Sequence, residues 1–103
     1  MKVSTEFLSK AETALKGLIL SQVPTGTRLY LFGSRARDDA HWNSDFDVLI
    51  DTPVGKEPTA PRIHAIKDLI DESWVPFKVD LITKQQCTGL FGQMVLSESR
   101  LWA

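Results

Sequence analysis

The stretch from Leu31 to Asp51, LFGSRARDDAHWNSDFDVLID, constrains the fold more than any other part of the chain. An apolar run ends at Gly33-Ser34, a polar connector follows, and the residues SDFD at 44–47 open a second apolar run. Gly at the end of a strand permits a turn that other residues resist. We therefore expect a strand, a Gly-Ser turn and a second strand that begins with alternating carboxylates.

The alternating carboxylates are Asp45 and Asp47. Side chains alternate between the two faces of a strand, so these two residues point the same way. Two carboxylates on one face repel each other unless a cation lies between them or one of them takes a proton. Carboxylate oxygens suit Mg²⁺ or Mn²⁺. On the D-x-D pattern alone, the commoner alternative is that Asp45 caps a turn and Asp47 is a solvated edge residue.

A third carboxylate, Asp80, interrupts the strand-like apolar run from Phe77 to Ile82. Burying an unpaired carboxylate is expensive, so Asp80 either lies on a wet face or has a partner. If this strand lies beside the strand that carries Asp45 and Asp47, three carboxylates converge. Three carboxylates are enough to hold two divalent ions, and two such ions can stabilise the attacking and leaving oxygens of a phosphoryl transfer.

Three motifs in this order carry a resemblance: GSRAR at 33–37, SDFDV at 44–48 and VDLI at 79–82. Together they resemble the nucleotidyltransferase superfamily that is related to DNA polymerase beta. Within it, the chain is most similar to the minimal nucleotidyltransferases, called MNT proteins, which are commonly paired with HEPN proteins. The resemblance covers nearly the whole chain. One position departs from the pattern, because Asp38 stands where the family often has Gly directly after GSRAR.

The resemblance implies a nucleotidyltransferase palm-like fold and an activity. The chain would move an NMP, expected to be AMP, from ATP or another NTP to a hydroxyl of a protein partner. That partner would be a small helical HEPN toxin, and the chain its antitoxin. The alternative is a binding module that neutralises the partner by occlusion, with a vestigial site. The metal would be two Mg²⁺ ions, or Mn²⁺. The implied catalytic and metal-binding residues are Asp45, Asp47 and Asp80, and the implied nucleotide-binding residues are Gly33, Ser34, Arg35, Arg37 and Ser44.

The two arginines of the first motif have two interpretations. Guanidinium groups suit phosphate geometry, so Arg35 and Arg37 are candidates for contact with the triphosphate. Alternatively, they pair with the neighbouring Asp38 and Asp39 or with the catalytic carboxylates. For Arg37 the pairing is the favoured interpretation, and for Arg35 the two are equal.

Composition limits the kinds of partner that the chain is expected to bind. We expect one domain, 1–103, and a net charge of −1 argues against strong nonspecific binding to nucleic acid. No apolar run approaches membrane-spanning length and no signal-peptide core follows Met1, so no membrane partner is expected. A single cysteine, Cys87, rules out an internal disulfide and fits a cytoplasmic location. A homo- or hetero-oligomer is compatible with all of this.

Hydrophobic periodicity predicts the order of the elements. We expect an α/β two-layer domain, in which helices pack on one face of a small mixed sheet and leave the carboxylate face open. The apolar terminus should fold back on the domain or contact a second chain. In the last helix, which Thr83 can cap, the predicted apolar stripe is Cys87, Leu90, Phe91, Met94 and Val95. The expected helices are 5–22, 62–73 and this last one, with a short helical turn at 35–39; the expected strands are 28–32, 45–51 and 77–82.

Overall fold

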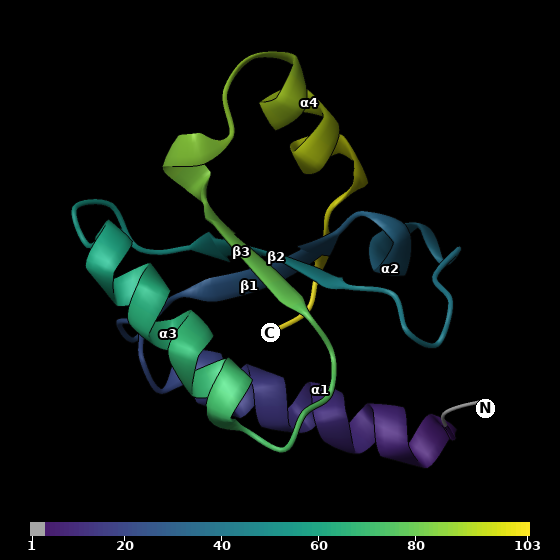
Figure 1. Ribbon diagram of the computed structural model, residues 1–103. Coiled ribbons are helices and arrows are strands. Elements are labelled where there is room, and N and C mark those ends of the chain that lie inside the picture. The colour runs from purple at the N-terminus through teal and green to yellow at the C-terminus, as the bar shows by residue number, and fades with distance from the viewer. Residues whose placement is uncertain (1–3) are drawn as a thin grey trace.

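A four-stranded sheet in the order β3-β2-β1-β4 forms the middle of the molecule (Figure 1). The computed structural model describes residues 4–103. Every strand and helix predicted from periodicity is present, with small changes at the ends. The elements in chain order are α1 (Thr5–Leu20), β1 (Arg28–Phe32), α2 (Ser34–Arg37), β2 (Phe46–Asp51), α3 (Ala60–Glu72), β3 (Val79–Thr83), the 3-10 helix η1 (Lys84–Gln86), α4 (Gly89–Glu98) and β4 (Arg100–Leu101).

The strand directions follow from the connections. β2 runs antiparallel to β1 and parallel to β3. Parallel neighbours need a crossover, and α3 supplies it between β2 and β3. β4 adds to the free edge of β1 in antiparallel orientation. The sheet is therefore mixed, as predicted, and β4 was not predicted because two residues are too short to show a period.

The two long helices, α1 and α3, cover one face of the sheet (Figure 1). They bury the residues of each strand that alternate toward them, which is the pattern that the periodicity predicts. Within residues 4–103, no helix is long and apolar enough to cross a membrane. The buried side chains of this layer include Ala11, Leu15 and Ile19 of α1, Ile66 and Ile70 of α3, and Leu29, Leu31, Phe46, Val48, Ile50 and Leu81 of the strands.

Side-chain caps set the helix starts. Ser4 Oγ accepts the Phe7 N–H at 3.1 Å, so α1 begins at Thr5 as predicted. The predicted start of α3 at residue 62 is two residues late. The hydroxyl of Thr59 accepts the Arg62 N–H, and Pro61 lies in the first turn, where its missing N–H is no loss.

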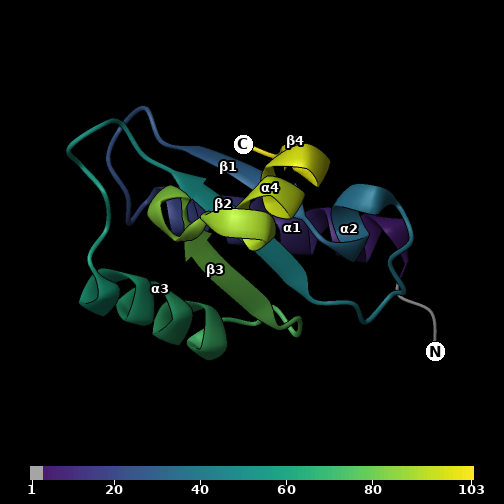
Figure 2. The same ribbon diagram turned by 90° about the horizontal axis from the view of Figure 1, so that it is seen from above.

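The opposite face of the sheet is partly covered as well. Val95 of α4 packs against Phe32 and Leu49, which point away from α1 and α3. Figure 1 shows α4 on one side of the strands and α1 and α3 on the other, and in Figure 2, seen from above, α4 lies in front of the strands and α1 behind them. The expectation of helices on one face thus holds for α1 and α3 alone, and the carboxylate face is not fully open.

The last helix presents a different face from the predicted stripe. A Cβ at Gly92 would overlap the backbone of Cys87, so the helix backbone lies directly against the end of η1. This close approach buries Gly92 and Val95 and turns the larger apolar side chains outward. α4 begins after Cys87, and the stripe residues that are exposed are Leu90, Phe91 and Met94.

The chain end folds back on the domain, as the first of the two alternatives predicted. The Leu29 N–H donates to the Ala103 carbonyl at 2.7 Å. Trp102 Nε1 donates to Glu12 Oε1 at 3.0 Å, and the Trp102 ring lies 5.8 Å from the Phe46 ring. These contacts join the terminus to α1 and to the centre of the sheet.

Candidate active site

Asp47 and Asp80 are direct neighbours on the sheet. The parallel register of β2 and β3 pairs their Cα positions, and side chains at paired positions lie on the same face. Leu49 and Ile82, two residues further along each strand, pack with Val95 of α4. The two carboxylates therefore lie on the α4 side. The condition stated for converging carboxylates, that the Asp80 strand lies beside the Asp47 strand, is met.

The Gly33 turn touches this pair from the end of β1. Gly33 has φ 73° and ψ −155°, a backbone conformation that favours glycine. A Cβ at this position would overlap Asp47 Oδ2 and lie 3.2 Å from Asp47 Cγ. The register explains the contact, because Phe32 is paired with Asp47 and Gly33 follows it. Glycine is thus required both by the turn and by the close approach of the carboxylate.

The environment of Asp47 opposes its negative charge. Burial, followed by repulsion from Asp80 and Asp45, raises the pKa of Asp47 to about 6. A hydrogen bond with Asp80 and the charge of Glu98 act in the same direction. A proton relieves this repulsion, and so does a divalent cation between the carboxylates. The site therefore favours a cation as soon as the pH is above that pKa.

The donor set fits a hard divalent cation. Two adjacent carboxylates supply the oxygen ligands that Mg²⁺ and Mn²⁺ prefer. Across residues 4–103, no three His, Cys, Asp or Glu side chains form a ready-made metal-binding group. Asp45 lies just before β2, near enough for its charge to act on Asp47. The Asp47–Asp80 pair is formed, and the participation of Asp45 as a third ligand stays a prediction.

Arg35 and Ser44 hold the polar connector in place. Arg35 Nε and Nη2 donate to the Ser44 carbonyl at 3.1 and 2.7 Å, and the guanidinium lies 4.0 Å from the centre of the Phe46 ring. Burial lowers the pKa of Arg35. Ser44 Oγ accepts the His41 N–H at 2.8 Å. Because Phe46 and Asp47 are consecutive in β2, they point to opposite faces, so Arg35 is not brought to the carboxylate pair.

Arg37 faces the carboxylate side of the molecule. Its Nη1 lies 3.0 Å from Glu98 Oε2 and its Nε lies 3.3 Å from Asp39 Oδ2, and these hydrogen bonds raise the pKa of Arg37. The pairing with Asp39 was one of the predicted alternatives. Ser34, the first residue of α2, is half-buried, and within residues 4–103 its hydroxyl makes no side-chain hydrogen bond.

Asp38, the departure from the family pattern, has a left-handed backbone with φ 64° and ψ 27°. Glycine adopts this conformation freely and aspartate tolerates it better than most residues, so the backbone here suits both Asp38 and the Gly that the resemblance leads us to expect. Asp38 lines a cavity of about 320 Å³ between α1 and the connector, together with Glu12 and Arg35. This cavity is on the α1 side of the sheet.

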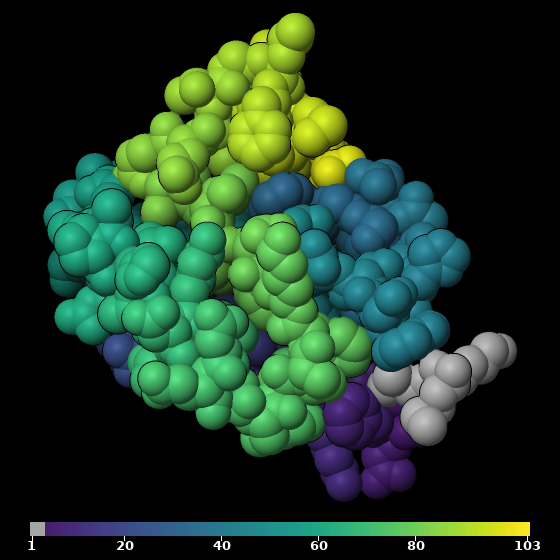
Figure 3. All heavy atoms as spheres, in the orientation of Figure 1, coloured from purple at the N-terminus to yellow at the C-terminus, as the bar shows by residue number. Residues whose placement is uncertain are grey.

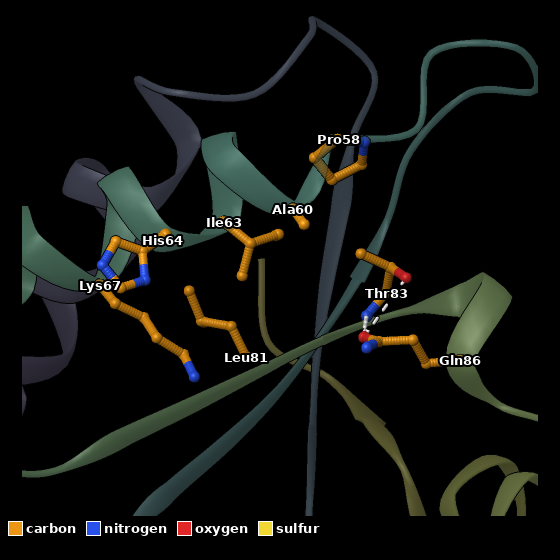
Figure 4. A pocket seen from close by; sticks show the side chains of 8 residues that line it. All are labelled: Pro58, Ala60, Ile63, His64, Lys67, Leu81, Thr83 and Gln86. Atoms are coloured by element: carbon orange, nitrogen blue, oxygen red, sulfur yellow. Dashed lines mark hydrogen bonds between the residues drawn. The ribbon is translucent and has the colours of Figure 1, made fainter.

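Another cavity, of about 310 Å³, lies between α3 and β3 (Figure 4). Leu81 and Thr83 line it, and they alternate along β3 with Asp80. The cavity therefore opens on the face opposite the carboxylate pair. Gln86 closes one end by accepting the Thr83 N–H at 2.8 Å. Its position separates it from the chemistry of Asp47 and Asp80.

Glu98 is the site residue that the sequence did not reveal. Its carboxylate reaches Gly33 and Arg37 from the C-terminal end of α4. It is the one acidic residue of that helix, GLFGQMVLSE, and nothing in its local pattern distinguishes it from a solvated residue. Its role depends on the packing of α4 against the carboxylate face, which periodicity cannot predict.

The fold and the site together define a class of protein. A small mixed sheet, a glycine turn in contact with the first carboxylate and a second carboxylate on the adjacent parallel strand are the parts of the predicted nucleotidyltransferase architecture. The sequence matches the family described as nucleotidyltransferase domain over residues 9–102. The chain belongs to this family, as the three motifs predicted. A search of curated proteins found no match.

Solved structures share the fold at low sequence identity. A toxin–antitoxin complex with AMP-PNP matches with a TM-score of 0.72 and 21% identity over 89% of this chain and 72% of that one. The MNT antitoxin in complex with tri-AMPylated HEPN toxin of Shewanella oneidensis matches with a TM-score of 0.69 and 17% identity over 92% and 71%. A protein described as a minimal nucleotidyltransferase has a TM-score of 0.66 and 23% identity over 95% of each chain. The α/β palm-like fold is thereby confirmed.

Proposed function

We propose that the chain is a metal-dependent nucleotidyltransferase that moves AMP from ATP to a hydroxyl of a protein partner, a HEPN-like toxin, and so acts as its antitoxin. The observation that carries this proposal is the Asp47–Asp80 pair, with its raised pKa at Asp47, in contact with the Gly33 turn. Repulsion within the carboxylate pair is relieved when a cation binds between the two groups. The glycine turn beside the pair lets a phosphate approach the backbone.

Asp45, Asp47 and Asp80 would hold the metal, as two Mg²⁺ ions or Mn²⁺. When bound, such ions neutralise phosphate charge and favour the attack of a hydroxyl oxygen on a phosphorus atom. Asp47 would take part in holding the metal with either neighbour, because Asp80 is its paired residue and the charge of Asp45 also acts on it.

The remaining residues bind and orient the reactants. The open hydroxyl of Ser34 and the turn at Gly33 seat the phosphates, and Arg37 supplies a positive charge beside them. Arg35 and Ser44 act at a distance by fixing the connector that leads into Asp45. The acceptor oxygen bonds to the α-phosphorus, the bond from that phosphorus to the bridging oxygen breaks, and pyrophosphate leaves. Asp80 takes the proton of the acceptor hydroxyl.

The choice of a protein acceptor is supported by the structural neighbours. One of them is an MNT antitoxin crystallised with an AMPylated HEPN toxin, and another is a toxin–antitoxin complex with AMP-PNP. Their identity to this chain is 17% and 21%, so they support the acceptor class by analogy of fold. A partner neutralised by occlusion alone is the competing function.

Labelled ATP tests this proposal. The chain is incubated with Mg²⁺ and a HEPN-type protein with which it forms a complex, with the label either on the α-phosphate or on the γ-phosphate. Transfer of AMP predicts that α-label appears on the partner and that γ-label does not. Asp47→Asn and Asp80→Asn should abolish the labelling. Asp51→Asn is the matched control, because Asp51 is on the same strand and face but outside the pair.

Two results would count against transfer. A stable complex without α-label on the partner, at saturating ATP and Mg²⁺, would favour occlusion. Label on a free small molecule instead of the protein would move the chain to another group of nucleotidyltransferases.

A further inference from the structure

Glu98, the last residue of α4, binds two groups of the candidate site at once. One carboxylate oxygen accepts the Gly33 N–H at 2.8 Å, and the other lies 3.0 Å from Arg37 Nη1. The Glu98 side chain is 15% exposed and the Arg37 side chain is 49% exposed, so the contact with Gly33 is the more shielded of the two. Figure 3 shows the C-terminal segment, in yellow, against the blue segment that contains α2. The Glu98 contacts therefore join the end of α4 to the glycine turn.

The two groups that Glu98 binds are donors suited to an anion. A backbone N–H and a guanidinium are regular partners of phosphate oxygens. Both belong to the set proposed above for the nucleotide phosphates, yet here a carboxylate of the chain itself satisfies them. We propose that Glu98 is an internal anion that competes with a nucleotide phosphate for the Gly33 N–H and Arg37, so that the C-terminal residues of α4 move when the phosphate binds. This inference rests on the proposed nucleotide-binding function.

The packing of α4 is consistent with such a movement. Of its residues, Gly92 and Val95 are buried, whereas Leu90, Phe91 and Met94 are exposed. Val95, in the last turn, is nevertheless fully buried against Phe32 and Leu49, and β4 pairs with β1 directly after the helix. The movement is therefore confined to residues 97–99, where Glu98 makes the contacts with the site. A helix with so few buried side chains belongs to the part of a fold that opens locally at low cost.

Removing the charge of Glu98 tells whether this residue competes with a bound phosphate or instead stabilises the phosphate site. In Glu98→Gln the side-chain oxygen still accepts the Gly33 N–H, but the negative charge is gone and Arg37 is released. One charge beside a phosphate in a partly shielded site corresponds to about tenfold in affinity. Asp39→Asn is the matched control. Asp39 also pairs with Arg37, but it is 59% exposed and leaves the Gly33 N–H to Glu98, so we expect less than about a twofold change.

The experiment is titration calorimetry of the wild-type chain, Glu98→Gln and Asp39→Asn with ATP and with inorganic triphosphate, each in Mg²⁺ and in EDTA. Competition predicts about tenfold tighter binding of both ligands by Glu98→Gln in either buffer. Amide hydrogen exchange of the wild-type chain is the second readout, and it needs no variant. Saturation with triphosphate should accelerate exchange at residues 97–99 of the α4 end.

The outcomes are distinct. If the wild-type chain binds ATP and Glu98→Gln binds it equally or more weakly, competition is wrong and the proposed nucleotide site stands. If Asp39→Asn tightens binding as much as Glu98→Gln, the tighter binding comes from the loss of any negative charge near Arg37, and the specific role of Glu98 is overturned. If no form binds ATP or triphosphate, both the proposed function and this inference fail. If Glu98→Gln does not fold, unchanged exchange at 97–99 in the saturated wild-type chain overturns the proposal, and faster exchange supports it.

Discussion

Replacing Asp47 by Asn should stabilise the metal-free protein at neutral pH. Asn has nearly the same shape but lacks the charge that burial, Asp80 and Asp45 disfavour. The pKa of Asp47, raised from 3.8 to about 6, measures how strongly the fold opposes ionisation of this carboxyl. At pH 7.5 the wild-type chain folds with Asp47 ionised against that opposition, and the variant does not.

The size of the effect follows from the shift. One pKa unit corresponds to about 1.4 kcal/mol, which sets a ceiling of about 3 kcal/mol on the change in the free energy of unfolding. Asp47 is only partly buried, so solvent screening reduces the expected gain to about 1.5 kcal/mol. Because the folded pKa lies above the unfolded one, wild-type stability from this group is present at low pH and is lost as the pH rises through 6. The gain should therefore fall below about 0.5 kcal/mol at pH 4.5.

Urea denaturation followed by circular dichroism, in EDTA at pH 4.5 and 7.5, measures this difference. Mg²⁺ at pH 7.5 should shrink the gain, because the ion already neutralises the wild-type carboxylates. Asp51→Asn is the control on the same strand. Its carboxylate lies 3.7 Å from Lys84 Nζ, so its loss should destabilise the fold by less than about 1 kcal/mol. A destabilised Asp47→Asn at pH 7.5, or an equal gain at both pH values, would refute the reasoning.

Four further substitutions, at three positions, test the local geometry, each by thermal or urea unfolding. Asp38→Gly should change the free energy of unfolding by less than about 0.5 kcal/mol, whereas Asp38→Val should lower it by about 1–2 kcal/mol, because a β-branched residue is strained at φ 64°. Gly92→Ala should lower it by about 2 kcal/mol, since its Cβ would overlap the Cys87 backbone. Arg35→Lys should lower it by about 1 kcal/mol, through loss of the planar contact with Phe46 and the paired donation to the connector. Unchanged unfolding in the last two would show that these contacts do not support the fold.

Local sequence patterns predicted much of the sheet and part of the site. The run that ends at Gly33 and the alternation of Asp45 and Asp47 depend only on neighbours in the chain, and strand periodicity carries them directly. Local patterns could not place Asp47 beside Asp80, because their strands are joined by a parallel crossover through α3. The resemblance to the nucleotidyltransferases implied that these two residues share one site. The structure bears out the pairing of those strands.

The remainder depends on contacts between distant segments. Leu90, Phe91 and Met94 fit a helical stripe, but the close approach of Gly92 to Cys87 decides which face is buried. The sequence favoured neither of two roles for Arg35, contact with the triphosphate or pairing with a carboxylate. In the structure its guanidinium instead packs on the ring of Phe46, on the face of the sheet away from the carboxylate pair. Glu98 joined the site because α4 packs on the carboxylate side. None of these outcomes has a signature in local sequence.

We propose above that the Asp47–Asp80 pair and the Gly33 turn form a metal-dependent nucleotide site. Thermal unfolding of the wild-type chain and of Asp80→Asn, alone and with Mg²⁺, ATP, or both, tests it most directly, because a ligand that binds only the folded state raises the melting temperature. We expect Mg²⁺ and ATP together to raise the wild-type melting temperature more than either does alone, and Asp80→Asn to remove this synergy. Superimposable wild-type curves with and without saturating Mg-ATP would contradict the claim.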